Sequence, residues 1–545
     1  MFRTRNFVRI VMSAALAGGL IWGGLAPAGL LIAGLPAVAG TTERVSVASD
    51  GTQANAQSGC IGYGGLGASF SADGRFVAFD SSASNLVPGD KNKVADVFVH
   101  DRQTGETTRV SICADGREGD SMSLNPSISA DGRFVAFVSA AHNFVRVDRS
   151  VGWPFRVYVH DRQTGQNTLV SVTAEGADLN VIRVRPSISD DGRFVAFRAG
   201  GYFFVSDLTE RTLTCVSGDP DGGGQDGPAI SGNGQFVAFC SRSSILVEGD
   251  NNGCDDIFVY DRDTGQTTRV SVASDGTEAN GASDWCPSIS ADGRYVTFQS
   301  DATNLVPGDT NGLPDIFVHD RHTGETTRAS VGANGEQGNG GALNPNISAD
   351  GCWLTFNSSA TNLVPDDTNN FTDVFVRDLL TGETTRVNVS DDGSEANDRA
   401  LRPSISGDGR CVGFVSAASN LVFGDTNAVD DVFVHDRLGV PAPPGVTVVS
   451  VVAGDIRQGR QYNITANVNN ETAGPLTLTV RCTVEDAQGH VQVLAPRTVS
   501  LASGSTGPVK FSDTSSLPKG TYTATVTVDG YPDVGDSNWD TFLIK

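Results

Sequence analysis

Short apolar runs alternate with polar stretches along most of this chain, and no helical periodicity organises them. Around residue 300, four runs rich in Val, Ile, Phe or Thr follow one another: Pro287–Ser290, Arg294–Ser300, Asp315–Asp320 and Thr326–Val331. Each run ends at a turn residue, so the segment predicts four β-strands. The second run is apolar at consecutive positions, as in Phe134–Phe137, which indicates a strand buried on both faces.

The four-strand unit occurs seven times, and its most regular phrase is Ser-x-Asp-Gly-Arg-Phe-Val-Ala-Phe. The Asp-Gly or Asn-Gly pair of this phrase begins at Asp73, Asp131, Asp191, Asn233, Asp292, Asp350 and Asp408. A period of roughly 58 residues with four short strands is typical of a β-propeller blade. A copy of the fourth strand, Arg44–Val47, precedes the first unit, and none follows the last. The sequence therefore predicts a seven-bladed β-propeller whose ring is closed by the N-terminal strand.

The repeats occupy residues 40–437 and are followed by a Pro-rich linker at residues 438–445. Residues 446–545 contain alternating apolar and polar runs separated by turn residues, among them Tyr462–Val468, Leu476–Val484 and Thr521–Val528. This pattern predicts a β-sandwich, so the expected fold class is all-β throughout.

The first 39 residues have the features of a secretion signal. Arg3, Arg5 and Arg9 precede an apolar stretch, and Ala37–Ala39 is a small-residue cleavage site. The apolar stretch spans about 25 residues against about 7–15 in typical signals, so an uncleaved membrane anchor is the alternative. We expect a secreted, periplasmic or cell-surface protein that contacts a membrane only where the signal is uncleaved.

The formal net charge of −24 bears on the partners of the protein. A surface of this charge repels the phosphates of nucleic acids and of anionic lipids. It suits a soluble surface and divalent cations, so we expect no nucleic acid partner.

Nine cysteines follow the signal, and export permits disulfides. The odd count leaves at least one cysteine unpaired. Cys254 and Cys286, like Cys352 and Cys411, lie at positions in neighbouring repeats that are compatible with pairing. Free, packed thiols are the alternative.

The connections between strands differ in length. The first and third connections of each repeat are tight turns, whereas the second and fourth are long, as in Asp301–Pro314 and Ala273–Cys286. Because strands in a blade run up and down, the long connections share one face, and binding residues usually lie on such loops. The second and third repeats are irregular, at Arg146–Arg156 and at Gly200–Tyr202.

An acidic phrase, Asp-x-Asn-x-x-x-Asp, recurs in five of the long loops. Its copies are Asp90, Asn92 and Asp96; Asp250, Asn252 and Asp256; Asp309, Asn311 and Asp315; Asp367, Asn369 and Asp373; and Asp425, Asn427 and Asp431. The spacing resembles part of an EF-hand loop, so calcium is one interpretation, with further ligands from backbone, water or a neighbouring loop. The other interpretation is that Asp and Asn only stabilise the turn.

Two further recurring residues favour structural roles. An Asp follows the third strand in every repeat, as at Asp101, and we expect it to accept backbone N–H bonds in the tight turn. Histidines precede it at His100, His160, His319 and His435, and their separation favours contacts between blades over one metal site.

The phrase at Pro126–Phe137, with the following Val-His-Asp-Arg, resembles the PD40-type propeller repeats of the TolB-like family across roughly residues 41–437. The resemblance implies a β-propeller in the bacterial envelope or outside the cell. The TolB-like pattern of a six-bladed ring behind an α/β domain does not fit seven repeats, so a Tol–Pal role is not expected. The tail at Gly520–Asp529 resembles the CARDB-type, immunoglobulin-like adhesion modules of bacterial surface proteins.

Residues at the entry to the innermost strands form a candidate ligand-binding mouth, namely Arg185, Trp285 and Arg402. The sequence has no Gly-x-Ser-x-Gly, His-Glu-x-x-His or Cys-x-x-Cys motif, which argues against familiar hydrolase and metal chemistry. We therefore expect a non-catalytic binding or scaffold protein that recognises protein or glycan through the long-loop face. The alternative functions are an extracellular polysaccharide lyase or hydrolase acting at the mouth, and a purely structural envelope protein.

Overall fold

The computed structural model describes residues 40–438, except 60–66, 146–154, 174–175, 180, 182 and 218–226, and in the C-terminal region it describes residues 446–453, 462–470, 476–486, 491–494, 497–501, 505–513, 520–528 and 539–544. All regular elements within these ranges are β-strands. The predicted signal and most of the predicted linker lie outside them. No helix with the length and apolar composition of a membrane span occurs among the described residues.

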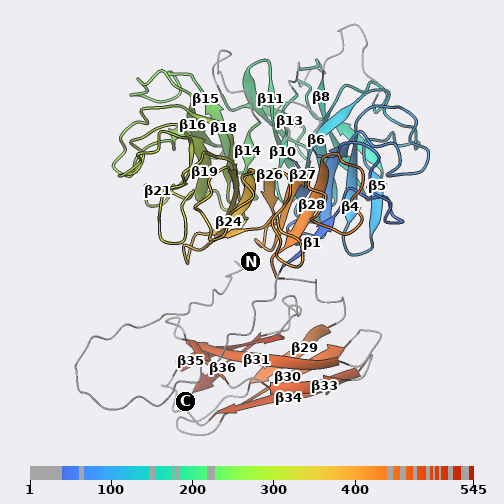
Figure 1. Ribbon diagram of the computed structural model, residues 1–545, viewed down its shortest axis with the longest axis vertical. Coiled ribbons are helices and arrows are strands. Elements are labelled where there is room, and N and C mark those ends of the chain that lie inside the picture. The colour runs from blue at the N-terminus through green and yellow to red at the C-terminus, as the bar shows by residue number, and fades with distance from the viewer. Residues whose placement is uncertain are drawn as a thin grey trace. The chain divides into compact units, whose positions relative to one another are not determined.

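Seven antiparallel sheets of four strands form the repeat region, and each is one blade (Figure 1). Blade 1 contains β2 (Ser69–Phe70), β3 (Phe76–Ser81), β4 (Asp96–Asp101) and β5 (Glu106–Arg109). Blade 2 contains β6 (Ser123–Ile128), β7 (Phe134–Ser139), β8 (Arg156–Asp161) and β9 (Gln166–Leu169). Blade 3 contains β10 (Ser187–Ile188), β11 (Phe194–Ala199), β12 (Tyr202–Asp207) and β13 (Thr212–Cys215). Blade 4 contains β14 (Ala229–Ile230), β15 (Phe236–Ser241), β16 (Asp256–Asp261) and β17 (Gln266–Arg269).

The remaining blades follow the same order. Blade 5 contains β18 (Ser283–Ile289), β19 (Tyr295–Ser300), β20 (Asp315–Asp320) and β21 (Glu325–Arg328). Blade 6 contains β22 (Ala342–Ile347), β23 (Trp353–Ser358), β24 (Asp373–Asp378) and β25 (Thr384–Arg386). Blade 7 contains β26 (Ala400–Ile405), β27 (Cys411–Ser416), β28 (Asp431–Asp436) and, as its fourth strand, β1 (Thr41–Arg44).

The ring closes as the sequence predicts. Strand β1 runs antiparallel to β28, with Thr41 opposite Asp436 and Arg44 opposite Phe433 (Figure 1). The innermost strands β2, β6, β10, β14, β18, β22 and β26 each contact the next one around the circle. The seven-bladed propeller is therefore confirmed, with the first and last parts of the repeat region joined in one sheet.

Some strand boundaries differ from the prediction. Strand β18 starts at Ser283 rather than at Pro287, and its register against β19 shifts between Asp284 and Ser288. The proline ring removes one N–H from the ladder, and a bulge before it absorbs the interruption. The fourth strand, β21, ends at Arg328, since the following residues turn away into the long loop.

The core lies between blades rather than within one. One cluster joins Val97 and Val99 of blade 1 to Val135 and Phe137 of blade 2, and all of these side chains are fully buried. The second strand of each blade is indeed buried on both faces, as its apolar run predicts. Burying one such aromatic or branched side chain contributes about 1.5–3 kcal/mol, so the neighbouring blades stabilise each other.

The tight-turn face carries a closed circle of backbone hydrogen bonds. The N–H of each first turn donates to a carbonyl in the next blade: Ala72 to Ala130, Ala130 to Asp190, Asp190 to Gly232, Asn233 to Ala291, Ala291 to Ala349, Ala349 to Gly407 and Asp408 to Ala72. The turn itself is held by Asp73, whose carboxylate accepts the Ser71 hydroxyl at 2.6 Å and the Arg75 N–H at 3.0 Å. This face is therefore repetitive and its backbone polar groups are engaged.

The cysteines among the described residues form no disulfide. Cys352 and Cys411 are not joined, because the Cys411 sulfur is buried beside Arg102, whose Nη1 donates to it at 2.9 Å. Burial raises the pKa of Cys411 to about 12, so the thiol is inert. Cys254 carries no disulfide, and the Cys286 side chain and Cys60 lie outside the described residues.

The C-terminal region is immunoglobulin-like and contains two sheets that contact each other. One sheet pairs β29 (Val446–Ala453), β30 (Tyr462–Asn470) and β34 (Ser505–Asp513). The other contains β31 (Leu476–Asp486), β32 (Val491–Val493), β33 (Arg497–Leu501), β35 (Gly520–Val528) and β36 (Trp539–Ile544). Ile464, Cys482 and Phe511 are buried in this region, as a sandwich core requires.

Candidate functional site

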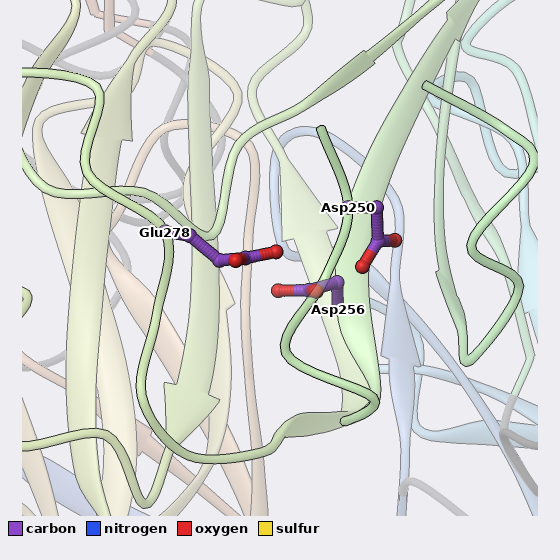
Figure 2. A group of neighbouring side chains, drawn as sticks. All are labelled: Asp250, Asp256 and Glu278. Carbon is purple, nitrogen blue, oxygen red and sulfur yellow. The ribbon is translucent and has the colours of Figure 1, made fainter. Parts of the chain in front are cut away.

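The long loops bring acidic side chains together at the start of the third strand. In blade 4, Asp250 and Asp256 lie in and after the second connection, and Glu278 comes from the fourth connection. Figure 2 shows the three carboxylates pointing toward one another. One oxygen of each lies within 4.8 Å of the others, a spacing that fits ligands of one metal ion.

An arginine occupies the same cluster. The Nη1 of Arg269, the last residue of β17, lies 3.3 Å from Asp250, 3.4 Å from Asp256 and 2.6 Å from Glu278. The arginine side chain is 10% exposed and the two aspartates are 3% and 0% exposed, so this ion cluster is buried. The guanidinium thus supplies positive charge to carboxylates that would otherwise repel one another.

The Asn of the acidic phrase stabilises the turn. Asn252 accepts the N–H of Cys254 at 2.8 Å, and its Nδ2 donates to Asp256 at 2.8 Å. This local bonding is what the turn interpretation of the sequence predicts. Calcium binding at these loops stays a prediction. An arginine already lies beside the carboxylates that would bind the ion.

The arrangement recurs in each blade that has the acidic phrase. The arginines are Arg109 in blade 1, Arg269 in blade 4, Arg328 in blade 5, Arg386 in blade 6 and Arg44 in blade 7. The third side chain is Glu118, Glu278 or Glu395 in blades 1, 4 and 6, and Gln337 or Gln53 in blades 5 and 7. Sequence reasoning missed this partner and the arginine, although the arginine recurs as the last residue of the fourth strand and its partner follows nine residues later.

Burial shifts the titration of these aspartates. Burial raises the pKa of Asp90 to about 6; Asp96 adds to the rise, and Arg109 opposes it. Burial also raises the pKa values of Asp256, Asp315 and Asp431, while hydrogen bonds and the nearby arginine lower them. One guanidinium therefore compensates the cluster only in part.

The described residues of blades 2 and 3 form no such cluster, in agreement with the irregular sequences of these blades. In blade 2, Arg156 stands where the other blades have the second Asp, and Leu169 stands where they have the arginine. Arg156 is fully buried and its Nη2 lies 2.6 Å from Asp178. In blade 3 the corresponding residues are Tyr202 and Cys215, so both charges are absent together.

A belt of hydrogen bonds joins the long loops of neighbouring blades. An N–H of the fourth connection donates to an Asn in the second connection of the next blade, as from Asn280 to Asn304 at 2.9 Å. The other links are Asn55 to Asn85, Asp120 to Asn143, Asn339 to Asn362 and Asn397 to Asn420. The long-loop face is therefore a connected frame rather than a set of independent loops.

The predicted mouth residues lie on three different blades. Arg185 lines a central cavity of about 190 Å³ together with Pro186 and Gly227. Trp285 is half exposed with φ 64°, and Arg402 has φ 55°. Blades 4 and 6 separate the three, so they are placed around the central axis and not in one cluster. The positive φ belongs to the bulge of the innermost strand, because Asn125 and Asn344 have it at the equivalent register shifts of their blades.

The other recurring residues have the structural roles expected. Asp101 accepts the Gln103 N–H at 3.0 Å and both donors of Arg75, at 2.9 and 2.7 Å. His100 contacts Thr107 at 2.9 Å, and the Thr107 hydroxyl donates to the Val47 carbonyl of the adjoining N-terminal segment. The histidines thus contribute to packing between blades.

Exposed apolar side chains are a further feature of the propeller, and sequence reasoning singled out only Trp285 among them. Six of them lie on the long-loop face of blades 4 to 7: Ile245, Trp285, Leu313, Leu343, Phe371 and Phe423. Phe423 is fully exposed and replaces the proline found at Pro307 and Pro365. An alignment of the seven repeats shows these apolar departures, but only the structure shows their exposure.

Comparison with known proteins gives one family match and several solved structures with low similarity. The CARDB family model matches residues 444–540. Solved structures with similarity include a putative TolB from Agrobacterium tumefaciens, with 16% identity, 60% of this chain and 89% of that chain covered, and a TM-score of 0.29. The tricorn protease has 13% identity, coverage of 79% and 43%, and a TM-score of 0.31. Porphyromonas gingivalis dipeptidyl peptidase 4 has 14% identity, coverage of 76% and 65%, and a TM-score of 0.38.

A search of the curated proteins finds no match. The TM-scores of these solved structures are low. The number of blades is given by the seven four-stranded sheets of this chain. The chain thus combines a seven-bladed β-propeller that resembles TolB-like propellers with a C-terminal region that matches the CARDB family.

Proposed function

We propose that this protein is a non-catalytic binding or scaffold protein of the bacterial envelope or cell exterior. Its binding surface is the long-loop face of blades 4 to 7, and its partner is a protein or glycan of the cell surface. The CARDB match and the TolB-like propeller support the cellular setting.

The distribution of exposed apolar side chains carries this proposal. Large apolar residues exposed on a soluble protein mark interaction surfaces when they gather on one face. Of the eight such residues within the described ranges, six lie on the long-loop face of four blades. The other two, Leu380 and Leu438, follow third strands on the tight-turn face.

The central cavity favours binding over catalysis. Among the described residues, its lining contains one acid, Asp190, and one base, Arg185, on either side of β10, with mainly apolar and small residues around them. General acid–base catalysis needs titratable groups positioned on the same reacting atoms. The alternative of a lyase or hydrolase at the mouth therefore has less support.

In this proposal, arginine takes the place of calcium at the predicted metal sites. We infer that arginine supplies the cation of the five acidic loops, because its Nη1 lies 3.1 to 3.5 Å from the first Asp of each one. Calcium binding at the same carboxylates requires that the arginine moves away.

A sedimentation assay tests the proposed surface. The full chain is incubated with isolated bacterial cell envelopes and, separately, with a glycan microarray. The double variant Phe371→Ser and Phe423→Ser should lose binding, whereas Leu380→Ser, on the tight-turn face, should retain it. Equal binding by the original chain, the double variant and Leu380→Ser would mean that the interaction lies elsewhere on the protein.

A further inference from the structure

We propose that the long-loop face of blades 4 to 7 binds a cationic protein segment with apolar side chains. This inference rests on the proposed function and names the chemistry of the partner. Two features of the face carry it, namely the apolar loop tips and the exposed carboxylates of the same loops, which form no ion pair with another described residue.

The apolar tips occupy related positions on neighbouring blades. Leu313 and Phe371 are the same position of the acidic loop, two residues before the third strand, and are 36% and 40% exposed. Trp285 and Leu343 lie on the adjacent innermost strands β18 and β22 and are 50% and 36% exposed. The exposed apolar side chains thus occur both on the long loops and on the innermost strands of these blades.

Carboxylates dominate the charge on the same loops. The exposed acids include Glu248, Asp275, Asp301, Glu336, Asp366 and Asp392, and none of these forms an ion pair with another described residue. Two exposed arginines on these loops are already paired: Arg242 with Asp255 at 2.7 Å and Arg399 with Asp430 at 3.7 Å. The loop arginines of the acidic clusters are only about a tenth exposed. The loops of this face therefore carry more exposed carboxylates than exposed cations.

The charge and the apolar side chains of this face indicate the chemistry of its partner. A partner that covers apolar tips and neutralises carboxylates needs apolar and basic side chains in alternation. Anionic lipids have the wrong charge, and a second copy of this chain carries the same net charge of −24. The belt of hydrogen bonds holds the loops before the partner arrives, which lowers the entropic cost of binding.

The probe for this inference is a synthetic amphipathic peptide of Leu and Lys, labelled with fluorescein, alongside a counterpart in which Glu replaces Lys. Fluorescence anisotropy measures their binding to the full chain. We expect the Lys peptide to bind and the Glu peptide to fail. A higher salt concentration should weaken binding of the Lys peptide, because part of its affinity is electrostatic.

Matched variants locate the site. The Phe371→Ser, Phe423→Ser double variant should weaken binding of the Lys peptide roughly tenfold or more, as loss of anchor side chains does. The Asp301→Asn, Asp366→Asn double variant should weaken it less and reduce the salt dependence. Leu380→Ser should bind as the original chain does, and circular dichroism should show all variants folded.

Three results would overturn the inference. These are failure of the Lys peptide to bind, equal binding of both peptides, and equal binding by the Phe371→Ser, Phe423→Ser variant. Dimers that form through the long-loop face in sedimentation velocity would instead assign the face to a second copy. Envelope binding that depends on Phe371 and Phe423, without binding of the Lys peptide, would leave the proposed function standing and reject only the cationic partner.

Discussion

Blades 4 to 7 and blades 2 and 3 share one backbone plan but differ on the long-loop face. Each of blades 4 to 7 holds a buried arginine between two aspartates, as Arg269 lies between Asp250 and Asp256. In blade 2 an arginine, Arg156, stands at the position of the second Asp and pairs with Asp178. The described residues of blade 3 have neither the second Asp nor the arginine. The described apolar tips occur on blades 4 to 7.

This difference between the blades indicates that the acidic phrase and the arginine form one structural unit. Where the second Asp is replaced, the arginine after it is replaced too, as Tyr202 and Cys215 show in blade 3. A buried carboxylate pair without a cation is costly, and so is a buried guanidinium without carboxylates. The unit therefore occurs complete, exchanged or not at all among the blades described here.

The largest expected effect comes from removing the arginine of a complete unit. Arg386→Ala leaves Asp367, Asp373 and Glu395 without their cation, and breaking a buried ion pair costs about 3–5 kcal/mol of unfolding free energy. Denaturant unfolding of the full chain measures the loss. Arg328→Ala should cost less, because Gln337 replaces the third carboxylate there. Equal losses would show that the third carboxylate does not matter.

Rebuilding the unit in blade 2 should show a smaller, coupled effect. Arg156→Asp alone places a second acid near Asp178 and should destabilise the chain by about 3 kcal/mol. Adding Leu169→Arg restores a cation at the position used by the other blades and should recover part of this loss. The double-mutant cycle in denaturant unfolding gives the coupling energy. A second substitution that adds its own loss instead of recovering stability would refute the shared unit.

The acidic loops should also give a measurable pH dependence. The pKa of Asp90 is raised by burial to about 6 in the folded protein, above its ordinary value of 3.8. Such a group stabilises the fold at low pH, and this stability is lost as the pH rises through the folded pKa. The stability difference between the original chain and Asp90→Asn should therefore fall between about pH 4 and pH 6. A constant difference across this range would contradict the raised pKa.

The smallest effect on stability is expected at the apolar tips. Phe423 is fully exposed, so Phe423→Ser should change the unfolding free energy by no more than about 0.5 kcal/mol. The same variant should still weaken binding to cell envelopes. A large loss of stability would mean that Phe423 packs in the fold and is not a binding residue.

The fold could be predicted because its signals are repeated and local. Seven copies of the Asp-Gly phrase identify the blades, and the displaced strand at Arg44 identifies how the ring closes. The cluster partners could not be predicted in the same way, because Arg269 and Glu278 reach Asp256 only through the pairing of strands and the path of a long loop. Exposure of Phe371 or Trp285 depends on the neighbouring blades, which no single repeat encodes.

We propose that arginine, rather than a metal ion, holds the loop frame that presents the binding face. The test is a thermal melt of the full chain in EDTA and then in millimolar calcium, with Arg269→Ala as the comparison. The melting temperature should be the same in both conditions and lower for Arg269→Ala. A large rise with calcium in the original chain, lost when Asp309 and Asp315 are replaced by Ala, would refute the arginine frame and make these loops calcium sites.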